Sequence, residues 1–171
     1  MTEKMFCFQC EQTAGCTGCT GSAGVCGKKA DTALLQDRLT GALIGLARTA
    51  EKNENSVTEK TDRLVIDGLF TTITNVNFNN ETISALIDRV HAERDRMIRE
   101  CPLCASAAEE NGDYDLRSFW NAQEDIRSLK SLILFGIRGI AAYAYHAAVL
   151  GYTDQEVNQF FYQALRSIGT D

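Results

Sequence analysis

Apolar residues recur at helical spacing along most of the chain after its first thirty residues. Asp31 can cap a helix, and it precedes an apolar series with steps of three and four residues: Leu34, Leu35, Leu39, Ala42, Leu43, Leu46 and Ala47. The stretch from Lys52 to Thr61 is polar and predicts a loop. The run from Leu64 to Ile73 is apolar on more than one side, which predicts a buried helix, although its β-branched residues leave a strand open.

The middle of the chain predicts a turn followed by an amphipathic helix. Residues Asn75 to Asn80 are typical of a turn that carries capping side chains. A helix is predicted from about Glu81 to Glu100, and Pro102 ends it because proline cannot continue a helix. The charge run from Arg89 to Glu100 predicts a solvent-facing surface or a docking face. The inward positions are Ile83, Leu86, Ile87, Val90 and Met97.

The last third of the chain predicts a loop and two more helices. The loop covers Ser106 to Tyr114, and a long helix runs from roughly Ala122 to Leu150. Gly151 is placed to end that helix. The sequence Thr-Asp-Gln-Glu from Thr153 has the form of a capping box and opens a last helix that reaches Ile168.

The long helix has small residues on its surface. Gly136, Gly139 and the alanine-rich stretch from Ala141 to Ala148 would let another helix approach closely. Alternating strand patterns are absent, so the predicted fold class is all-α: a helical bundle with a Cys/Gly-rich loop at its N-terminus. We expect a single domain over residues 1–171, with the loop in 1–28 and the bundle in 29–171.

Charge and hydropathy narrow the function classes. The net charge of -6 argues against nucleic acid as a partner. No charged segment followed by an apolar one opens the chain, so we expect no secretory signal. Arg138 interrupts the most apolar stretch, and the uncharged run from Gly139 to Thr153 is too short to span a membrane. We therefore expect a cytoplasmic protein whose cysteines are ligands or free thiols rather than disulfides.

Five of the seven cysteines lie close together near the N-terminus, interleaved with five glycines: Cys7, Cys10, Cys16, Cys19 and Cys26. Thiolates are soft ligands for iron and zinc, and glycine lets the backbone fold tightly around a metal. Zinc sites favour two CxxC pairs with a longer spacer, whereas five residues separate the pairs here, and Cys26 would be left over. A disulfide knot would need an oxidising compartment. An iron–sulfur cluster is favoured, with zinc and disulfides as alternatives.

Several segments resemble the hybrid cluster proteins, also called prismane proteins or hydroxylamine reductases. The resemblance is carried by Met-Phe-Cys-Phe-Gln-Cys-Glu-Gln-Thr-Ala from Met5, by Gly-Cys-Thr from Gly18 and by Gly-Val-Cys-Gly-Lys from Gly24. It continues in Leu-Gln-Asp from Leu35, in the run from Leu69 to Phe78 that contains Thr-Asn-Val-Asn-Phe, and from Leu134 to Gly151. It covers nearly the whole chain.

The resemblance implies a conventional iron–sulfur cluster held by Cys7, Cys10, Cys19 and Cys26. Their spacers hold two, eight and six residues. The branch of the family that binds a [4Fe-4S] cubane shares the first two spacers but has one residue fewer in the last, whereas a branch that shares the last spacer binds [2Fe-2S]. We expect one [4Fe-4S] cluster, with [2Fe-2S] as the alternative. Cys16 is an alternative ligand in place of Cys19, and is otherwise a spare thiol.

In that family a second centre, the hybrid iron–sulfur–oxygen cluster, lies in later domains that this chain does not contain. The resemblance therefore implies an electron-transfer domain of an oxidoreductase that acts on hydroxylamine or nitric oxide, with no catalytic residues of its own. The implied partners are an electron-donor reductase and the remainder of the hybrid cluster protein or another subunit. A zinc-stabilised helical binding module and a redox or nitrosative sensor remain the alternative functions.

Other residues with reactive side chains have plainer interpretations. Cys101 and Cys104 form a CxxC without a preceding strand, which predicts two ordinary cysteines at a turn; a sensor function would use this pair or Cys16. His91 is expected to be solvated, and it would be the first extra ligand if Cys101 and Cys104 bound a metal. His146 is expected in the core or at an interface. Aromatic residues expected to serve in packing are Trp120, Tyr143 and Tyr145.

Overall fold

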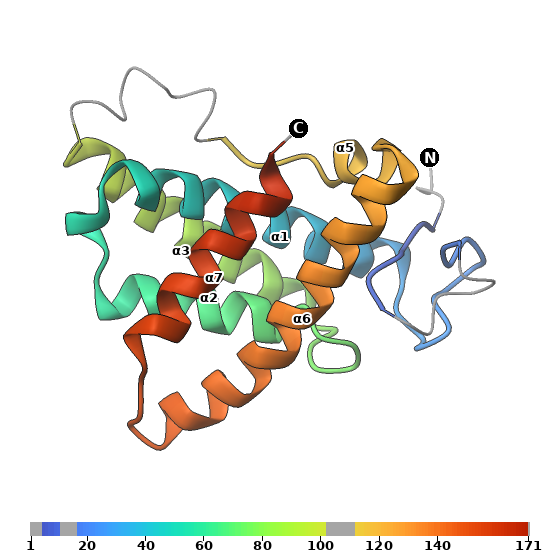
Figure 1. Cartoon of the computed structure of the whole chain (residues 1–171). Coiled ribbons are helices and arrows are strands. Elements are labelled where there is room, and N and C mark those ends of the chain that lie inside the picture. Colours follow the sequence, from blue (N-terminus) through green and yellow to red (C-terminus); the bar gives the residue numbers. More distant parts are fainter. Residues whose placement is uncertain (1–4, 11–16, 102–111, 171) are drawn as a thin grey trace.

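The computed structural model describes residues 5–10, 17–101 and 112–170, and the statements below concern these residues (Figure 1). Within them the chain forms helices and no strand, which confirms the all-α prediction. The elements are α1 (Ala30–Lys52), the 3₁₀ helix η2 (Glu54–Ser56), α2 (Glu59–Thr71), α3 (Asn80–Arg99), α5 (Leu116–Asn121), α6 (Glu124–Val149) and α7 (Gln155–Gly169).

Helix α1 is the centre of the bundle. It packs against α3 and α7, while α2 packs against α6, and in Figure 1 α6 and α7 lie on the viewer's side of α1. Two glycines allow close approaches between segments. A Cβ on Gly41 would lie 2.2 Å from the carbonyl oxygen of Tyr114, and one on Gly68 would lie 2.8 Å from the side chain of Leu43. A larger residue at either position would push these segments apart.

Two helix starts differ from the prediction. Helix α1 begins at Ala30, so Asp31 lies in its first turn and accepts a hydrogen bond from the backbone N–H of Thr32 instead of capping the helix. Helix α2 begins at Glu59 because Thr58 and Thr61 form a capping box, which makes the predicted loop too long. The segment from Leu64 is helical, as predicted, and the strand alternative is wrong.

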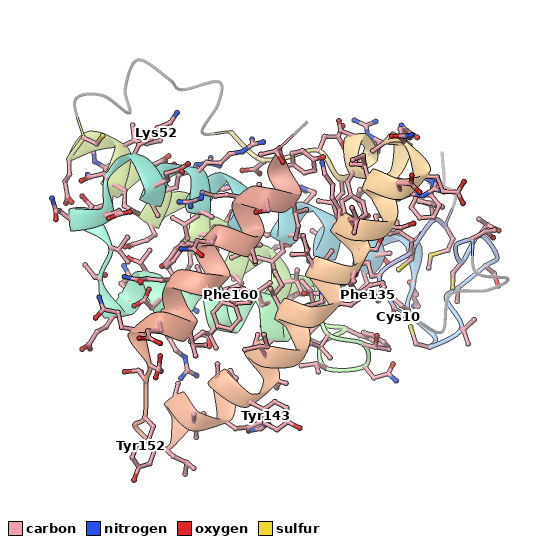
Figure 2. All side chains as sticks on the ribbon, in the orientation of Figure 1. Cys10, Lys52, Phe135, Tyr143, Tyr152 and Phe160 are labelled. Atoms are coloured by element: carbon pink, nitrogen blue, oxygen red, sulfur yellow. The ribbon has the colours of Figure 1, made fainter. Side chains whose placement is uncertain are left out.

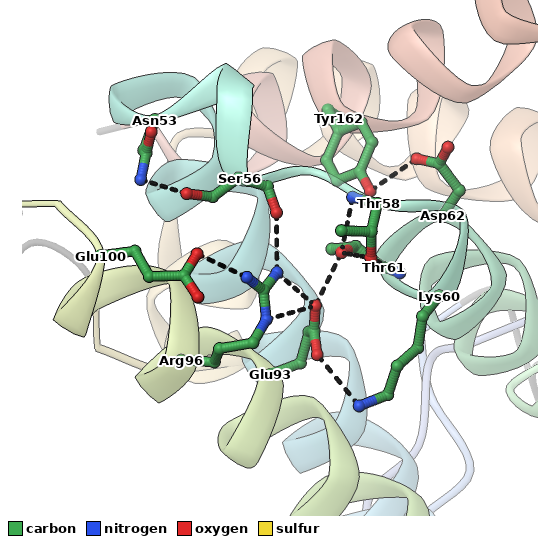
Figure 3. A network of polar contacts seen from close by, with 10 residues as sticks. All are labelled: Asn53, Ser56, Thr58, Lys60, Thr61, Asp62, Glu93, Arg96, Glu100 and Tyr162. Atoms are coloured by element: carbon green, nitrogen blue, oxygen red, sulfur yellow. Dashed lines mark hydrogen bonds and ion pairs between the residues drawn. The ribbon is translucent and has the colours of Figure 1, made fainter.

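Helix α3 follows the predicted turn, and Asn79 caps it. Its predicted apolar face is buried, but its charged face is not uniformly solvated. Glu93 is 2% exposed, and it contacts residues of α2 and α3 (Figure 3). The prediction that the charge run faces solvent is therefore wrong at Glu93.

Helix α6 has an unexpectedly exposed apolar face. An added Cβ at Gly136 or Gly139 would meet no atom within 4 Å, so no helix of the described part of the chain uses the space that these glycines leave. Tyr143, which we expected in packing, is 82% exposed and points away from the bundle (Figure 2). We call this surface the α6 outer face; its large apolar residues are Leu129, Leu132, Phe135, Ile140, Tyr143 and Leu150.

Of the described helices, α6 alone is long and apolar enough to cross a membrane, judged by length and composition. The sequence argument treated Arg138 as an interruption of this apolar stretch, whereas the helix as a whole, charges included, meets the length and composition of a membrane span. Lys130 and Arg138 of α6 are nevertheless buried within the protein, while several large apolar residues of the same helix are exposed.

The other aromatic and histidine predictions have mixed outcomes. Tyr145 is partly buried and stacks on Phe70 with ring centroids 4.0 Å apart, as expected of a packing residue. His146 is exposed rather than in the core, and its ring meets Phe70 edge-on. His91 is half-buried rather than solvated, because its Nε2 lies 2.9 Å from the carboxylate of Asp113.

Candidate metal centre

Two of the predicted ligands are held side by side by the backbone. Cys7 and Cys19 form an isolated antiparallel bridge, in which the N–H of Cys7 donates to the carbonyl of Cys19 at 3.1 Å and the reverse bond measures 2.8 Å. Residues paired in this way have neighbouring side chains. Both cysteines are 7% exposed, so their sulfurs lie where water is largely excluded.

The loop that carries these cysteines is anchored by apolar contacts on two sides. Cys7 and Cys19 pack with Met5 and with Ala33 of α1 in a small cluster separate from the main core. Phe8 enters the main core, where its ring lies 5.2 Å from that of Phe119 in α5 and 4.5 Å from that of Trp120.

Phe6 lies on the other side of Cys7, and its ring meets Trp120 edge-on at 5.0 Å. The two phenylalanines that flank Cys7 therefore both rest on α5, and Trp120 packs as predicted.

A tight turn surrounds Cys26. The N–H of Gly24 donates to the carbonyl of Lys28 at 2.8 Å, and the N–H of Gly27 donates to the carbonyl of Gly24 at 2.9 Å. Gly27 has a φ of 85°, a conformation that favours glycine. A Cβ on Gly24 would lie 3.5 Å from the sulfur of Cys26, so this turn leaves space beside the thiol.

Lys28 brings a positive charge to the buried thiol of Cys7. Its side chain is buried, and its Nζ lies 3.9 Å from the sulfur of Cys7. Burial raises the pKa of Cys7, and the charge of Lys28 partly opposes that rise. A metal ligand must be a thiolate, so this ammonium favours the state that binds metal.

Behind the loop lies a polar network that the sequence analysis did not identify. It links Gln9 in the loop to Lys28, to Asp37 on α1 and to Arg138 on α6. Burial raises the pKa of Asp37 to about 6, while the contact with Gln9 and the charge of Arg138 oppose the rise. The available sequence signal was Arg138 itself, a charge in the middle of the most apolar stretch of the chain.

The donor set fits an iron–sulfur group in its chemistry. Four thiols lie in one loop, and none of them forms a disulfide. Cys10 and Cys26 are half-buried. The described residues contain no group of three or more Cys, His, Asp or Glu side chains arranged to hold a metal ion, so the structure pairs Cys7 with Cys19 but does not assemble the full set.

The structure does not place the other three cysteines at this site. Cys16 and Cys104 lie outside the described residues, so their roles stay predictions. Cys101 is buried at the end of α3 and is disulfide-bonded, which contradicts the expectation of ligands and free thiols throughout the chain.

Comparison with known proteins identifies the family. The family model described as Prismane/CO dehydrogenase family matches residues 5–171. Proteins named hydroxylamine reductase are similar along nearly the whole chain. That of Methanocella arvoryzae is 40% identical over 189 residues, which cover 96% of this chain and 34% of the relative. That of Thermodesulfovibrio yellowstonii is 40% identical over 183 residues, covering 94% and 33%.

The hydroxylamine reductase of Nitratidesulfovibrio vulgaris is 37% identical over 194 residues, covering 98% of this chain and 34% of the relative. The chain thus spans about a third of the length of the relatives it matches. The matched residues include the cysteine loop and every helix described above, as the resemblance noted in the sequence predicted. This chain belongs to the Prismane/CO dehydrogenase family.

Proposed function

We propose that this chain is an iron–sulfur electron-transfer domain of a hydroxylamine reductase-type oxidoreductase, with Cys7, Cys10, Cys19 and Cys26 as the ligands of one [4Fe-4S] cluster. The observation that carries the proposal is the buried pairing of Cys7 with Cys19, because it brings together thiols from two parts of the loop. Membership in the family and the names of the relatives support an iron–sulfur cofactor. A [2Fe-2S] cluster is the alternative.

The bound cluster would supply a one-electron redox couple. The chain's own residues prepare its surroundings. The apolar cluster around Cys7 and Cys19 excludes water, and Lys28 places a cation beside the sulfur of Cys7. Cys10 and Cys26 lie nearer the surface, and Val25 beside Cys26 is exposed, so this edge of the loop suits the approach of an electron donor.

The electron donor that we propose is a cytoplasmic reductase. The electron would then pass to domains that correspond to the part of the relatives outside the match with this chain. The α6 outer face supports such an arrangement, because it leaves six large apolar residues uncovered in a chain that spans about a third of its relatives. We propose that the remaining domains, or a subunit that replaces them, pack on this face. Tyr143→Glu should weaken co-purification with those domains, whereas Glu124→Gln at the start of the same helix should not.

The experiment that tests the cofactor is iron and acid-labile sulfide analysis of anaerobically purified protein. Near-equal iron and sulfide with a broad visible absorption would support the proposal, and four iron atoms per chain would identify the cubane. Colourless protein with one zinc would instead support the zinc-stabilised binding module. Absence of any metal, with reversible oxidation of cysteine, would support the sensor.

A further inference from the structure

Arg138 is a buried cation that connects α6 to three other segments. Its side chain is almost fully buried, at 4% exposure. Its Nε donates to the hydroxyl of Thr72 at 3.0 Å, its Nη1 to the carbonyl of Gln9 at 2.9 Å, and its Nη2 to the hydroxyl of Thr40 at 3.4 Å. Thr40 belongs to α1, and Thr72 caps the C-terminus of α2. One side chain therefore joins the cysteine loop to α1, α2 and α6.

Gln9, the residue that Arg138 contacts in the loop, is also held by its side chain. Its Oε1 accepts a hydrogen bond from Lys28 at 3.2 Å. Its Nε2 donates to the carbonyl of Ala33 at 3.3 Å and to the carboxylate of Asp37. Gln9 is buried, so these bonds are not in competition with bulk water. Gln9 lies between Cys7 and Cys10, so contacts that hold its backbone and side chain restrain the segment that carries both thiols.

The same network has an excess of buried positive charge. Arg138 and Lys28 are cations, and Asp37 is the carboxylate that faces them. Burial lowers the pKa of Arg138 to about 10, and the charges of Asp37, Cys7 and Cys10 oppose that fall, so the guanidinium stays charged at neutral pH. A buried charge that is excluded from water acts on nearby groups more strongly than a charge on the surface.

We infer that Arg138 is a positioning residue for the proposed iron–sulfur centre: it holds the segment between Cys7 and Cys10 in place, and its charge favours the reduced form of the centre. The inference rests on the proposed function. One-electron reduction adds a negative charge to the centre, and a fixed cation nearby stabilises that added charge. The charge of Arg138 therefore raises the reduction potential, and its hydrogen bonds limit the motion of the loop.

The first test is a redox titration of the full chain carrying its cluster. Arg138→Met should shift the potential to more negative values, by about a tenfold change in the redox equilibrium, or about 59 mV for one electron. Arg138→Lys retains the charge and should shift it by less than half as much. Arg117→Met removes the same charge from an exposed position and should have no effect. A fully loaded Arg138→Met protein with the wild-type potential would overturn the electrostatic role.

The second test needs no cluster: amide hydrogen exchange of the metal-free chain. The N–H groups of Cys7 and Cys19 should exchange about tenfold faster in Arg138→Met, while those in the centre of α3 keep the wild-type rate. Thr72→Val leaves the cation and its bond to Gln9 but removes one anchor, so it should give a smaller increase and an unchanged potential. If Arg138→Met does not fold, Thr72→Val serves as the test variant in the exchange experiment.

These two readouts separate the inference from the proposed function. A wild-type chain that contains no iron–sulfur cluster would refute the proposed function, and the exchange experiment would still decide whether Arg138 fixes the loop. Wild-type exchange rates at Cys7 and Cys19 in both Arg138→Met and Thr72→Val would refute the positioning role.

Discussion

The carboxylate of Glu93 on α3 accepts a hydrogen bond of 2.7 Å from the hydroxyl of Thr61 on α2. The guanidinium of Arg96 donates to the same carboxylate at 2.7 Å and also to the carbonyl of Ser56, and Lys60 lies 3.3 Å away (Figure 3). Glu93 thus joins the start of α2 to the middle of α3.

Glu93→Gln should destabilise the protein, because it removes a buried charge whose hydrogen-bond donors stay in place. Hydrogen bonds to charged groups contribute about 1.5–3 kcal/mol, and we expect the free energy of unfolding to fall by about that amount. Urea unfolding followed by circular dichroism measures it. Asp95→Asn, at an exposed position of the same helix, is the control and should change the free energy by less than about 0.5 kcal/mol. Equal effects of the two substitutions would contradict the prediction.

Acid should weaken this contact. Burial raises the pKa of Glu93, but the hydrogen bonds from Arg96, Thr61 and Lys60 outweigh it and lower the pKa to about 2. Because the folded pKa lies below the ordinary value, the contribution is complete above about pH 4.5 and is lost as the pH falls towards 2. Wild type should therefore lose its advantage over Glu93→Gln across this range. A difference that stays constant from neutral pH to pH 2 would show that the charge is unimportant.

Replacing any one proposed ligand should release iron. Cys7→Ser, Cys10→Ser, Cys19→Ser and Cys26→Ser should each lower the iron content, since a missing thiolate leaves an iron atom without its protein ligand. Cys16→Ser is the matched control within the loop and should retain iron. Full iron in Cys19→Ser, together with loss in Cys16→Ser, would identify Cys16 as the third ligand.

Removal of the cluster should leave the helices intact. Burial of the apolar faces of α1, α2, α3, α6 and α7 in one core does not involve the cysteine thiols. Far-UV circular dichroism of the metal-free chain should therefore match that of the loaded chain, while the loop becomes more sensitive to protease. Loss of most helical signal would instead place the protein among folds that form only with metal.

The isolated chain should accept electrons without reducing hydroxylamine. Substrate reduction needs an open metal position, and a cluster with four cysteine ligands provides none. We expect dithionite to bleach the visible absorption and an added acceptor to restore it, with no hydroxylamine-dependent oxidation of reduced viologen. Sustained oxidation of viologen by the pure chain would contradict this prediction and would require either a labile cluster iron or a second reactive centre.

Local periodicity predicted the helices well, because each amphipathic segment carries its own burial pattern. The inward face of α3 and the long helix α6 are where the spacing placed them. Helix starts were less accurate, since the bond between Thr58 and Thr61 competes with the loop preference of the polar residues around it. The burial of Glu93 depends on Thr61 and Lys60 of α2, which a pattern within one helix cannot contain.

The same limit applies to the candidate site. The cysteine spacing indicated the metal chemistry, and the resemblance indicated which four thiols to choose. The pairing of Cys7 with Cys19 and the bond from Arg138 to Gln9 join positions far apart in the sequence. Arg138 looked like an interruption of an apolar stretch because its partners come from three other segments.

The packing of Phe6 and Phe8 on Trp120 supplies the protein with its own optical reporter. Trp120 is the only tryptophan in the chain, and its ring contacts both residues that flank Cys7. Its fluorescence therefore reports whether the cysteine loop is seated against α5. Because the broad visible absorption of an iron–sulfur group overlaps indole emission, loading of the loop should also quench that emission, so assembly can be followed in real time without any added label.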